Sequence, residues 1–383
     1  MHRFILRRIL WTFPVLFLVT IITFGMGQLT PGGPYSAYLL ADSRGAGRTI
    51  PPEIQANIQA RYGLDQPAWK QYLHYMGQLI FHLDFGPSLR QFNRTVNDIV
   101  FGDGYLRNVL RERLRDTFGL NACSMTFAEP PGFFRSSAVV VKPSGEIVGE
   151  IRITWGDRLQ VVGRFLHLAP VMVSAQIGIA SAVLALGVGV PLGVLCALRP
   201  GSWIDHLALC VSVLGISVPS FLLGIVLILI FALRLEWLPT YGWGDDWRQV
   251  ILPAVTLSTG GWPLIARLTR ASLLDSMRAD YVRTAWAKGL REQIVVLRHA
   301  LRNALIPVTT ILGPLVAGWM TGSFVVESVF SIGGIGYLFL KAVVGRDYPL
   351  IMGITLIYST VLVAFNLLVD IAYGVLDPRV RLE

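Results

Sequence analysis

Charged side chains are scarce in this sequence of 383 residues. Only 15% of the residues are charged and 53% are hydrophobic, whereas ordinary soluble domains are about one quarter charged. This shortage argues against a typical soluble protein, and the long apolar runs indicate an integral membrane protein. The net charge of +9 could indicate a nucleic-acid partner. The positions of the basic residues explain that surplus better, so we expect no nucleic-acid partner.

Motifs for catalysis and metal binding are also missing. The three cysteines, Cys123, Cys196 and Cys210, form neither a disulfide framework nor a zinc spacing. The histidines are scattered and show no metal-ligand spacing. There is no HExxH, no GxSxG and no GxxxxGK(S/T) phosphate loop, and no Gly-Lys dipeptide occurs. We therefore expect a chain that is not an enzyme and that holds no cofactor and no metal.

Apolar runs long enough to cross a bilayer dominate what is present. A helix of about 20 apolar residues crosses the roughly 30 Å of hydrocarbon. Six predicted spans lie at residues 9–28, 168–198, 207–233, 251–268, 305–330 and 350–375. A cleaved signal peptide is the alternative for the first run, but the run is too long and Gly27-Gln28-Leu29 is a poor cleavage site. The sequence thus predicts an all-α membrane protein with six transmembrane helices.

The Lys and Arg residues predict that both termini are cytoplasmic. The cytoplasmic pieces would be residues 1–8, 199–205, 267–303 and 377–383. The third of these carries Arg267, Arg270, Arg278, Arg283, Lys288, Arg291, Arg298 and Arg302 against only three acids.

Polar groups inside the spans are sparse; they are Gln176, Glu327, Asn366 and Asp370. Proton- or sodium-coupled transporters usually need acids at the membrane midplane. No predicted span carries an obvious acid at the membrane midplane, and this absence argues against a self-powered secondary transporter. Gly- and Pro-rich stretches, GVGVPLG at 187–193 and SVPSFLLG at 217–224, fit either close helix packing or a bundle that opens and closes.

The predicted topology divides the chain into four regions. Residues 1–30 form the N-terminus and first span, and residues 168–383 form a domain of five spans. Between them, residues 31–100 are an extracytoplasmic helical region, since apolar residues repeat there at helical spacing after Pro67. Residues 101–167 form an extracytoplasmic insertion. Its β-branched runs, separated by turn residues, predict two or three short strands.

The segment DYVRTAWAKGL, residues 280–290, interrupts the apolar pattern with a short amphipathic helix. Tyr281, Val282, Ala285, Trp286, Gly289 and Leu290 share one side, and Asp280, Arg283, Thr284, Ala287 and Lys288 share the other. Asp280 suits the N-cap or the first turn, and Gly289 suits a left-handed C-cap. Such a helix could lie on anionic lipid or dock on a partner. The small Ala285 and Gly289 on its apolar side favour a closely fitting partner.

At these residues the chain resembles a known family. The segment and the following REQIVVLRHALRNALIPVTTILGPLVAG resemble the EAA-type cytoplasmic loop of ABC importer permeases, specifically those of the dipeptide/oligopeptide/nickel family. RRILWTFPVLFLVTIITFGMGQLTPGGP, YGLDQPAWKQYL, VVESVFSIGGIGYL and NLLVDIAYGVLDPRVR agree with that family in the same order. The resemblance covers residues 1–100 and 168–383.

The resemblance implies a permease subunit without its own ATPase, in a prokaryotic cell membrane. Its partners would be ABC ATPase subunits, a second homologous permease and an extracytoplasmic substrate-binding protein. The helix would dock in a groove on the ATPase and pass its closure to the bundle. The implied ATPase-coupling residues are Asp280, Tyr281, Val282, Arg283, Thr284, Ala285, Trp286, Ala287, Lys288 and Gly289. Tyr281 and Val282 would fill the groove, and Arg283 and Lys288 would meet its polar rim.

Three features depart from the family pattern. Trp286 stands where a basic residue is usual, Gly333 stands where a proline is usual, and residues 101–167 have no counterpart. The insertion would contact the binding protein, shield the entrance, or be a decorative surface domain. The expected function is import of di- or oligopeptides by alternating access. The alternatives are import of nickel or another small solute, and a membrane scaffold that transports nothing and binds a partner through the insertion.

Overall fold

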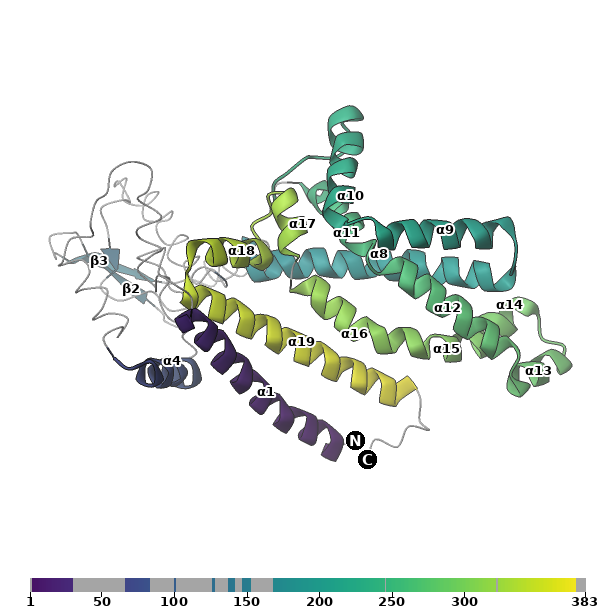
Figure 1. Cartoon of the computed structure of the whole chain (residues 1–383), viewed down its shortest axis with the longest axis horizontal. Helices are drawn as coiled ribbons and strands as arrows, with labels where there is room; N and C mark the ends of the chain where they lie inside the picture. Colours follow the sequence, from purple (N-terminus) through teal and green to yellow (C-terminus); the bar gives the residue numbers. More distant parts are fainter. Residues whose placement is uncertain are drawn as a thin grey trace. The chain divides into compact units, whose positions relative to one another are not determined.

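The computed structural model describes residues 2–29, 66–82, 100, 126–127, 137–141, 147–152 and 168–376, except residues 245 and 322. The chain divides into two compact units, one of Met1–Ile50 with Ser174–Glu383 and the other of Pro51–Val173. Figure 1 shows the elements along the chain.

The described part of the first unit is helical (Figure 1). Its elements are α1 His2–Leu29, α8 Pro170–Leu198 (which begins in the other unit), α9 Trp203–Ser217, α10 Ser220–Leu227, the π-helix η2 Ile228–Arg234, the 3-10 helix η3 Trp247–Val250, α11 Ile251–Ser258, α12 Trp262–Met277, α13 Asp280–Ala287, α14 Glu292–Ile294, the π-helix η4 Val295–Ala300, α15 Leu301–Ala304, α16 Ile306–Met320, α17 Phe324–Val329, α18 Ile335–Gly345 and α19 Tyr348–Leu376.

The described part of the second unit holds one helix and one small sheet. The helix is α4, Ala68–His82, and the strands are β1 Thr126–Phe127, β2 Ser137–Val141 and β3 Ile147–Arg152. The sheet is antiparallel in the order β1-β2-β3, with a register shift at Val140/Val141. Most of residues 101–167 lies outside the described residues. The β-rich character of that insertion therefore stays a prediction.

Four of the six predicted spans coincide with apolar helical stretches of membrane-spanning length in the structure. Within the described residues, Leu10–Leu29, Pro170–Leu198, Ile306–Val329 and Tyr348–Leu368 are long and apolar enough to cross a membrane. Large apolar side chains such as Trp11, Phe13 and Leu29 are exposed on α1. Such exposure suits lipid, which does not penalise apolar surface as water does.

The predictions of a single helix at 207–233 and at 251–268 are wrong. The first is a pair, Trp203–Gly215 and Ser220–Arg234, bent by 104°, and the second is Trp247–Ser258 and Trp262–Met277, bent by 55°. Pro219 explains the first break, because a residue before proline is pushed out of the helical region, and Val218 has ψ 124°. Gly260 and Gly261 lie at the second break. Counting each pair as one span gives up to six.

Two glycines of α8 let it lie directly on α12. A Cβ atom on Gly189 would come within 2.8 Å of the Trp262 carbonyl oxygen, and one on Gly193 within 2.6 Å of the Ala266 carbonyl oxygen. Both gaps are too small for any side chain, so the GxxxG spacing permits backbone contact. At this place the Gly-rich stretch serves helix packing, one of its two expected roles.

The start of α8 is tied to the turn between α17 and α18 by buried polar groups. Ser174 Oγ donates to Glu327 Oε1 at 2.7 Å and accepts from the backbone N–H of Ile335 at 2.9 Å. Glu327 Oε2 accepts from the backbone N–H of Tyr337 at 2.7 Å. Glu327 thus places a carboxylate at the N-terminus of α18, where backbone donors are unpaired within the helix. These hydrogen bonds give a structural reason for an acid at position 327 within a predicted span.

Candidate functional site

The helix α13 begins and ends where the local sequence requires. Ala279 has an extended backbone with φ −72° and ψ 149° and makes no side-chain cap, so Asp280 is a first-turn acid. The helix was predicted over 280–290 but its last residue is Ala287. Gly289 then takes φ +72°, a left-handed conformation that stops the helix and that glycine adopts at little cost.

Two residues of α13 face the interior of the chain, and the rest face outward. Val282 is 0% exposed and Ala285 is 4% exposed. Their spacing of three residues puts them on the same side of the helix. The exposed residues are Asp280, Tyr281, Arg283, Thr284, Trp286, Ala287, Lys288 and Gly289.

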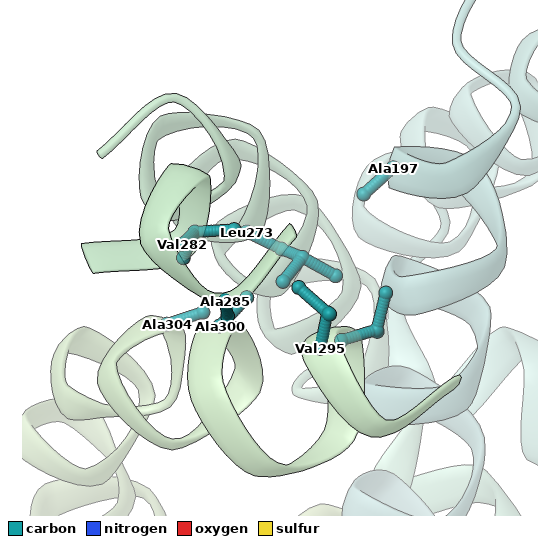
Figure 2. Packing of buried hydrophobic residues seen from close by; sticks show 8 residues of the cluster. Ala197, Leu273, Val282, Ala285, Val295, Ala300 and Ala304 are labelled. Atoms are coloured by element: carbon teal, nitrogen blue, oxygen red, sulfur yellow. The ribbon is translucent and has the colours of Figure 1, made fainter. Parts of the chain in front are cut away.

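The buried pair belongs to a hydrophobic cluster that forms the base of α13 (Figure 2). The cluster, called here the α13 base, contains Ala197, Leu273, Val282, Ala285, Val295, Val296, Ala300 and Ala304. These residues come from α8, α12, α13, η4 and α15. Through this cluster α13 contacts η4 and α12 and is connected by them to α8 and α15.

The structure places Val282 and Ala285 inside the chain, which differs from the outward placement that their expected roles require. Val282 was expected to fill a groove on the partner, and Ala285 to let the partner approach closely. Both side chains are already enclosed by the chain's own residues, because the segment after α13 folds back beneath it as η4. The amphipathic pattern was correctly assigned to a helix, but its predicted apolar side is divided: Val282 and Ala285 are buried in the chain itself, whereas Tyr281 and Trp286 are exposed.

The π-helix η4 brings widely spaced residues to the base. Val295, Val296 and Ala300 are all buried in η4. Its i→i+5 hydrogen bonding widens the turn, so residues five apart, such as Val295 and Ala300, approach the same side. In an α-helix they would be about 140° apart around the axis. Single π turns are frequent at functional sites, and this one lies directly under the candidate site.

The outer face of α13 combines two aromatic and two basic side chains. Tyr281 is 43% and Trp286 is 42% exposed. Within the described ranges, Arg283 makes a long contact with Asp280, 3.6 Å between Nη1 and Oδ1, with both side chains exposed, and such a pair contributes little. Tyr, Trp and Arg are the residues that most often dominate the energy of protein–protein contacts. The outer face therefore offers anchors for a partner.

A buried ion pair near the α13 base was missed by the sequence analysis. Arg270 Nε donates to Asp205 Oδ1 at 2.6 Å, and Arg270 Nη2 donates to Asp205 Oδ2 at 2.7 Å. The Asp205 side chain is 2% exposed and that of Arg270 is 27% exposed. The pair joins α9 to α12. The available signal was one acid, Asp205, at the edge of a long apolar stretch.

The comparisons with known proteins agree on one family. The sequence model described as "Binding-protein-dependent transport system inner membrane component" matches residues 189–382, which include α13. The model described as "Binding-prot-dependent transport system membrane comp, N-term" matches residues 1–95. The two matches leave residues 96–188 between them uncovered.

Curated relatives match over the whole chain. The Dipeptide transport system permease protein DppB of Bacillus subtilis (strain 168) is 35% identical over 383 residues, covering 100% of this chain and 99% of that protein. The Oligopeptide transport system permease protein OppB of Escherichia coli (strain K12) is 34% identical over 382 residues, covering 100% of both. A solved structure of the MetNI methionine ABC transporter is 18% identical, with a TM-score of 0.46, covering 56% of this chain and 98% of that one, a likeness too weak to argue from.

Proposed function

Because the chain belongs to the family of binding-protein-dependent transport system inner membrane components, we propose that it is the permease subunit of an ATP-driven importer of di- or oligopeptides. The protein is a multi-pass component of the inner membrane. The named relatives are dipeptide and oligopeptide permeases, and their likeness over the full chain supports the same solute class here.

The single observation that carries the proposal is the division of α13 into two faces. Val282 and Ala285 anchor the helix in its own chain, whereas Tyr281, Arg283 and Trp286 stand outside. A helix that only filled the core would have no reason to expose two aromatics beside cations. We propose that the outer face docks on a separate ATPase and that the α13 base passes the motion of the ATPase to the bundle.

We further propose a topology of six spans with both termini in the cytoplasm. Contacts within the first unit support it. A Cβ atom on Gly27, near the end of α1, would lie 3.0 Å from Tyr348 Cδ1 at the start of α19, so these helices run antiparallel. Ser174 at the start of α8 contacts Glu327 near the end of α17. Ala197 near the end of α8 contacts the α13 base, at the opposite end of that helix.

The complete importer would contain further subunits. Membership of a binding-protein-dependent system implies an ATPase and a substrate-binding protein. We propose that a second, homologous permease completes the pathway and that the solute crosses between the two by alternating access. The insertion at residues 101–167, which falls between the two family matches, would contact the binding protein or shield the entrance.

The test is recovery of the ATPase with the tagged protein from native membranes in mild detergent. The variant Tyr281→Ala with Arg283→Glu changes only exposed residues of α13, and it is expected to lose the ATPase. Arg234→Glu makes the same charge change at an exposed residue at the end of η2 and is expected to retain it. Failure of the wild-type protein to recover an ATPase, or equal recovery by both variants, contradicts the coupling role.

A further inference from the structure

We propose that the Asp205–Arg270 ion pair is a positioning element that makes α9 follow α12 when α13 is displaced. The inference rests on the proposed function, because it concerns how motion of the ATPase reaches the bundle. It assigns a role to two residues outside α13.

Three segments of the chain meet at Asp205. Its carboxylate accepts from Arg270 of α12 and also from the backbone N–H of Gly201 at 3.0 Å. Its own backbone N–H donates to Ser202 Oγ at 3.3 Å, which caps α9. Asp205 therefore connects the turn that follows α8, the first turn of α9 and the middle of α12.

Arg270 lies on α12 between residues that contact two other parts of the chain. On one side of it, Thr269 packs against Gly193 of α8. Leu273, one turn further, belongs to the α13 base. Between these two residues, Arg270 contacts α9 through its ion pair with Asp205. Five consecutive residues of α12, 269–273, thus include a contact to α8, a contact to α9 and a contact to the base of α13.

Without the ion pair, α9 would lose a contact with α12 close to the α13 base. Among the described residues, the α13 base includes members of α8, α12, η4 and α15 but none of α9. Elsewhere α9 meets α12 through Gly215, where a Cβ atom would lie 3.4 Å from Pro263 Cγ, near the other end of α9. Within the part of the chain that the structure describes, the ion pair is thus a polar link between α9 and α12 close to the base.

The ion pair joins one guanidinium to one carboxylate by two hydrogen bonds. A guanidinium that donates two parallel hydrogen bonds fixes both the distance and the orientation of a carboxylate, which a lysine cannot do. Because Asp205 is buried, salt screens the pair far less than an exposed pair. A buried ion pair is weak evidence for stability. Its two-point geometry suits a part that must keep two helices in register during motion.

The experiment uses the complete importer, purified from its native membrane and reconstituted in liposomes with its binding protein. ATP hydrolysis and uptake of labelled tri-alanine are measured together, and the coupling ratio is uptake divided by hydrolysis. Asp205→Asn and Arg270→Lys are expected to lower this ratio by about 2- to 30-fold, the range found for residues that carry coupling between sites. Assembly with the ATPase is expected to persist, because α13 is unchanged.

The matched control is the Asp246–Arg248 pair. Arg248 Nε donates to Asp246 Oδ2 at 2.8 Å, but the two residues are neighbours in one turn and their side chains are 51% and 27% exposed for arginine and aspartate. Asp246→Asn removes an ion pair of the same kind without separating two helices. It is expected to keep the wild-type coupling ratio.

The outcomes separate the two proposals. A wild-type complex that takes up no tri-alanine or any other labelled peptide on ATP addition contradicts the proposed function. An active wild type whose Arg270→Lys variant assembles and keeps the wild-type ratio overturns the role of the ion pair alone, whether or not Asp205→Asn assembles. A partial recovery of the ratio in the exchanged double variant, Asp205→Arg with Arg270→Asp, supports the ion pair itself.

Discussion

Replacing Val282 by alanine tests whether the buried face of α13, formed by Val282 and Ala285, anchors the helix in its own chain. The side chain is 0% exposed and lies among the α13 base residues. The change removes two methyl groups, each worth about 0.8 kcal/mol when buried, and the cavity adds to the loss, giving about 2 kcal/mol in the free energy of unfolding. For domains of 150–250 residues, this corresponds to a fall of about 4–8 °C in the thermal midpoint.

The assay is thermal unfolding of the purified permease in detergent, followed by tryptophan fluorescence at one fixed scan rate, because the midpoint depends on the scan rate when unfolding is irreversible. Tyr281→Ala is the matched control, since it truncates the adjacent, exposed residue of the same helix. It is expected to shift the midpoint by less than about 2 °C while reducing recovery of the ATPase. An unchanged midpoint for Val282→Ala, or a larger shift for Tyr281→Ala, would refute the assignment of the two faces.

Three further predictions use the same thermal measurement. Gly193→Leu is expected to lower stability by about 1–3 kcal/mol or more, because the side chain has no space against α12; Gly187→Leu, on the same helix with open space around it, is expected to be neutral, and equal effects would contradict the packing. Gly289→Ala is expected to cost about 1 kcal/mol or more, because of its φ of +72°; no loss would contradict the left-handed C-cap. Ser174→Ala is expected to cost about 1–3 kcal/mol, because it leaves Glu327 with one buried oxygen unsatisfied; an unchanged midpoint would contradict the buried link.

The positions of the helices followed from the sequence more reliably than their continuity. Length and apolar composition sufficed for α1, α8 and α19, since a membrane-length helix needs little else. The break before Pro219 was visible in principle, because proline restricts the residue that precedes it. Proline is nevertheless tolerated inside membrane helices, as at Pro191 within α8. The residue type alone therefore does not decide between a continuous helix and a break.

The short helix α18, Ile335–Gly345, was not predicted at all. It follows a turn in which Ser331 has φ 52° and Gly334 is the N-cap. Its start depends on Glu327, which lies several residues upstream in another helix and accepts from the backbone N–H of Tyr337. A cap supplied from another helix leaves no local sequence signal, unlike a Ser or Asp directly before a helix.

The candidate site shows the same limit at the level of single residues. Periodicity identified α13 and separated its apolar from its polar side, but it could not say what covers the apolar side. Both a partner groove and the chain's own η4 satisfy the same pattern, since each buries residues spaced three or four apart. Only the return of Val295 and Ala300 beneath Val282 decides between them. That return depends on a π-helix, whose wider turn is not signalled by a period of 3.6 residues.

The position of Arg270 gives this arrangement a mechanical consequence. Arg270 is one of the eight basic residues that indicated the cytoplasmic side, and nothing in the sequence distinguished it from neighbours such as Arg278. In the structure, Arg270 pairs with the buried carboxylate of Asp205, whereas Arg278 is exposed. The same charge thus contributes to topology and fixes α9 on α12. Because Leu273 follows one turn later in the α13 base, the contact of α12 with the α13 base and its contact with α9 lie on adjacent turns of one helix, as the proposed coupling requires.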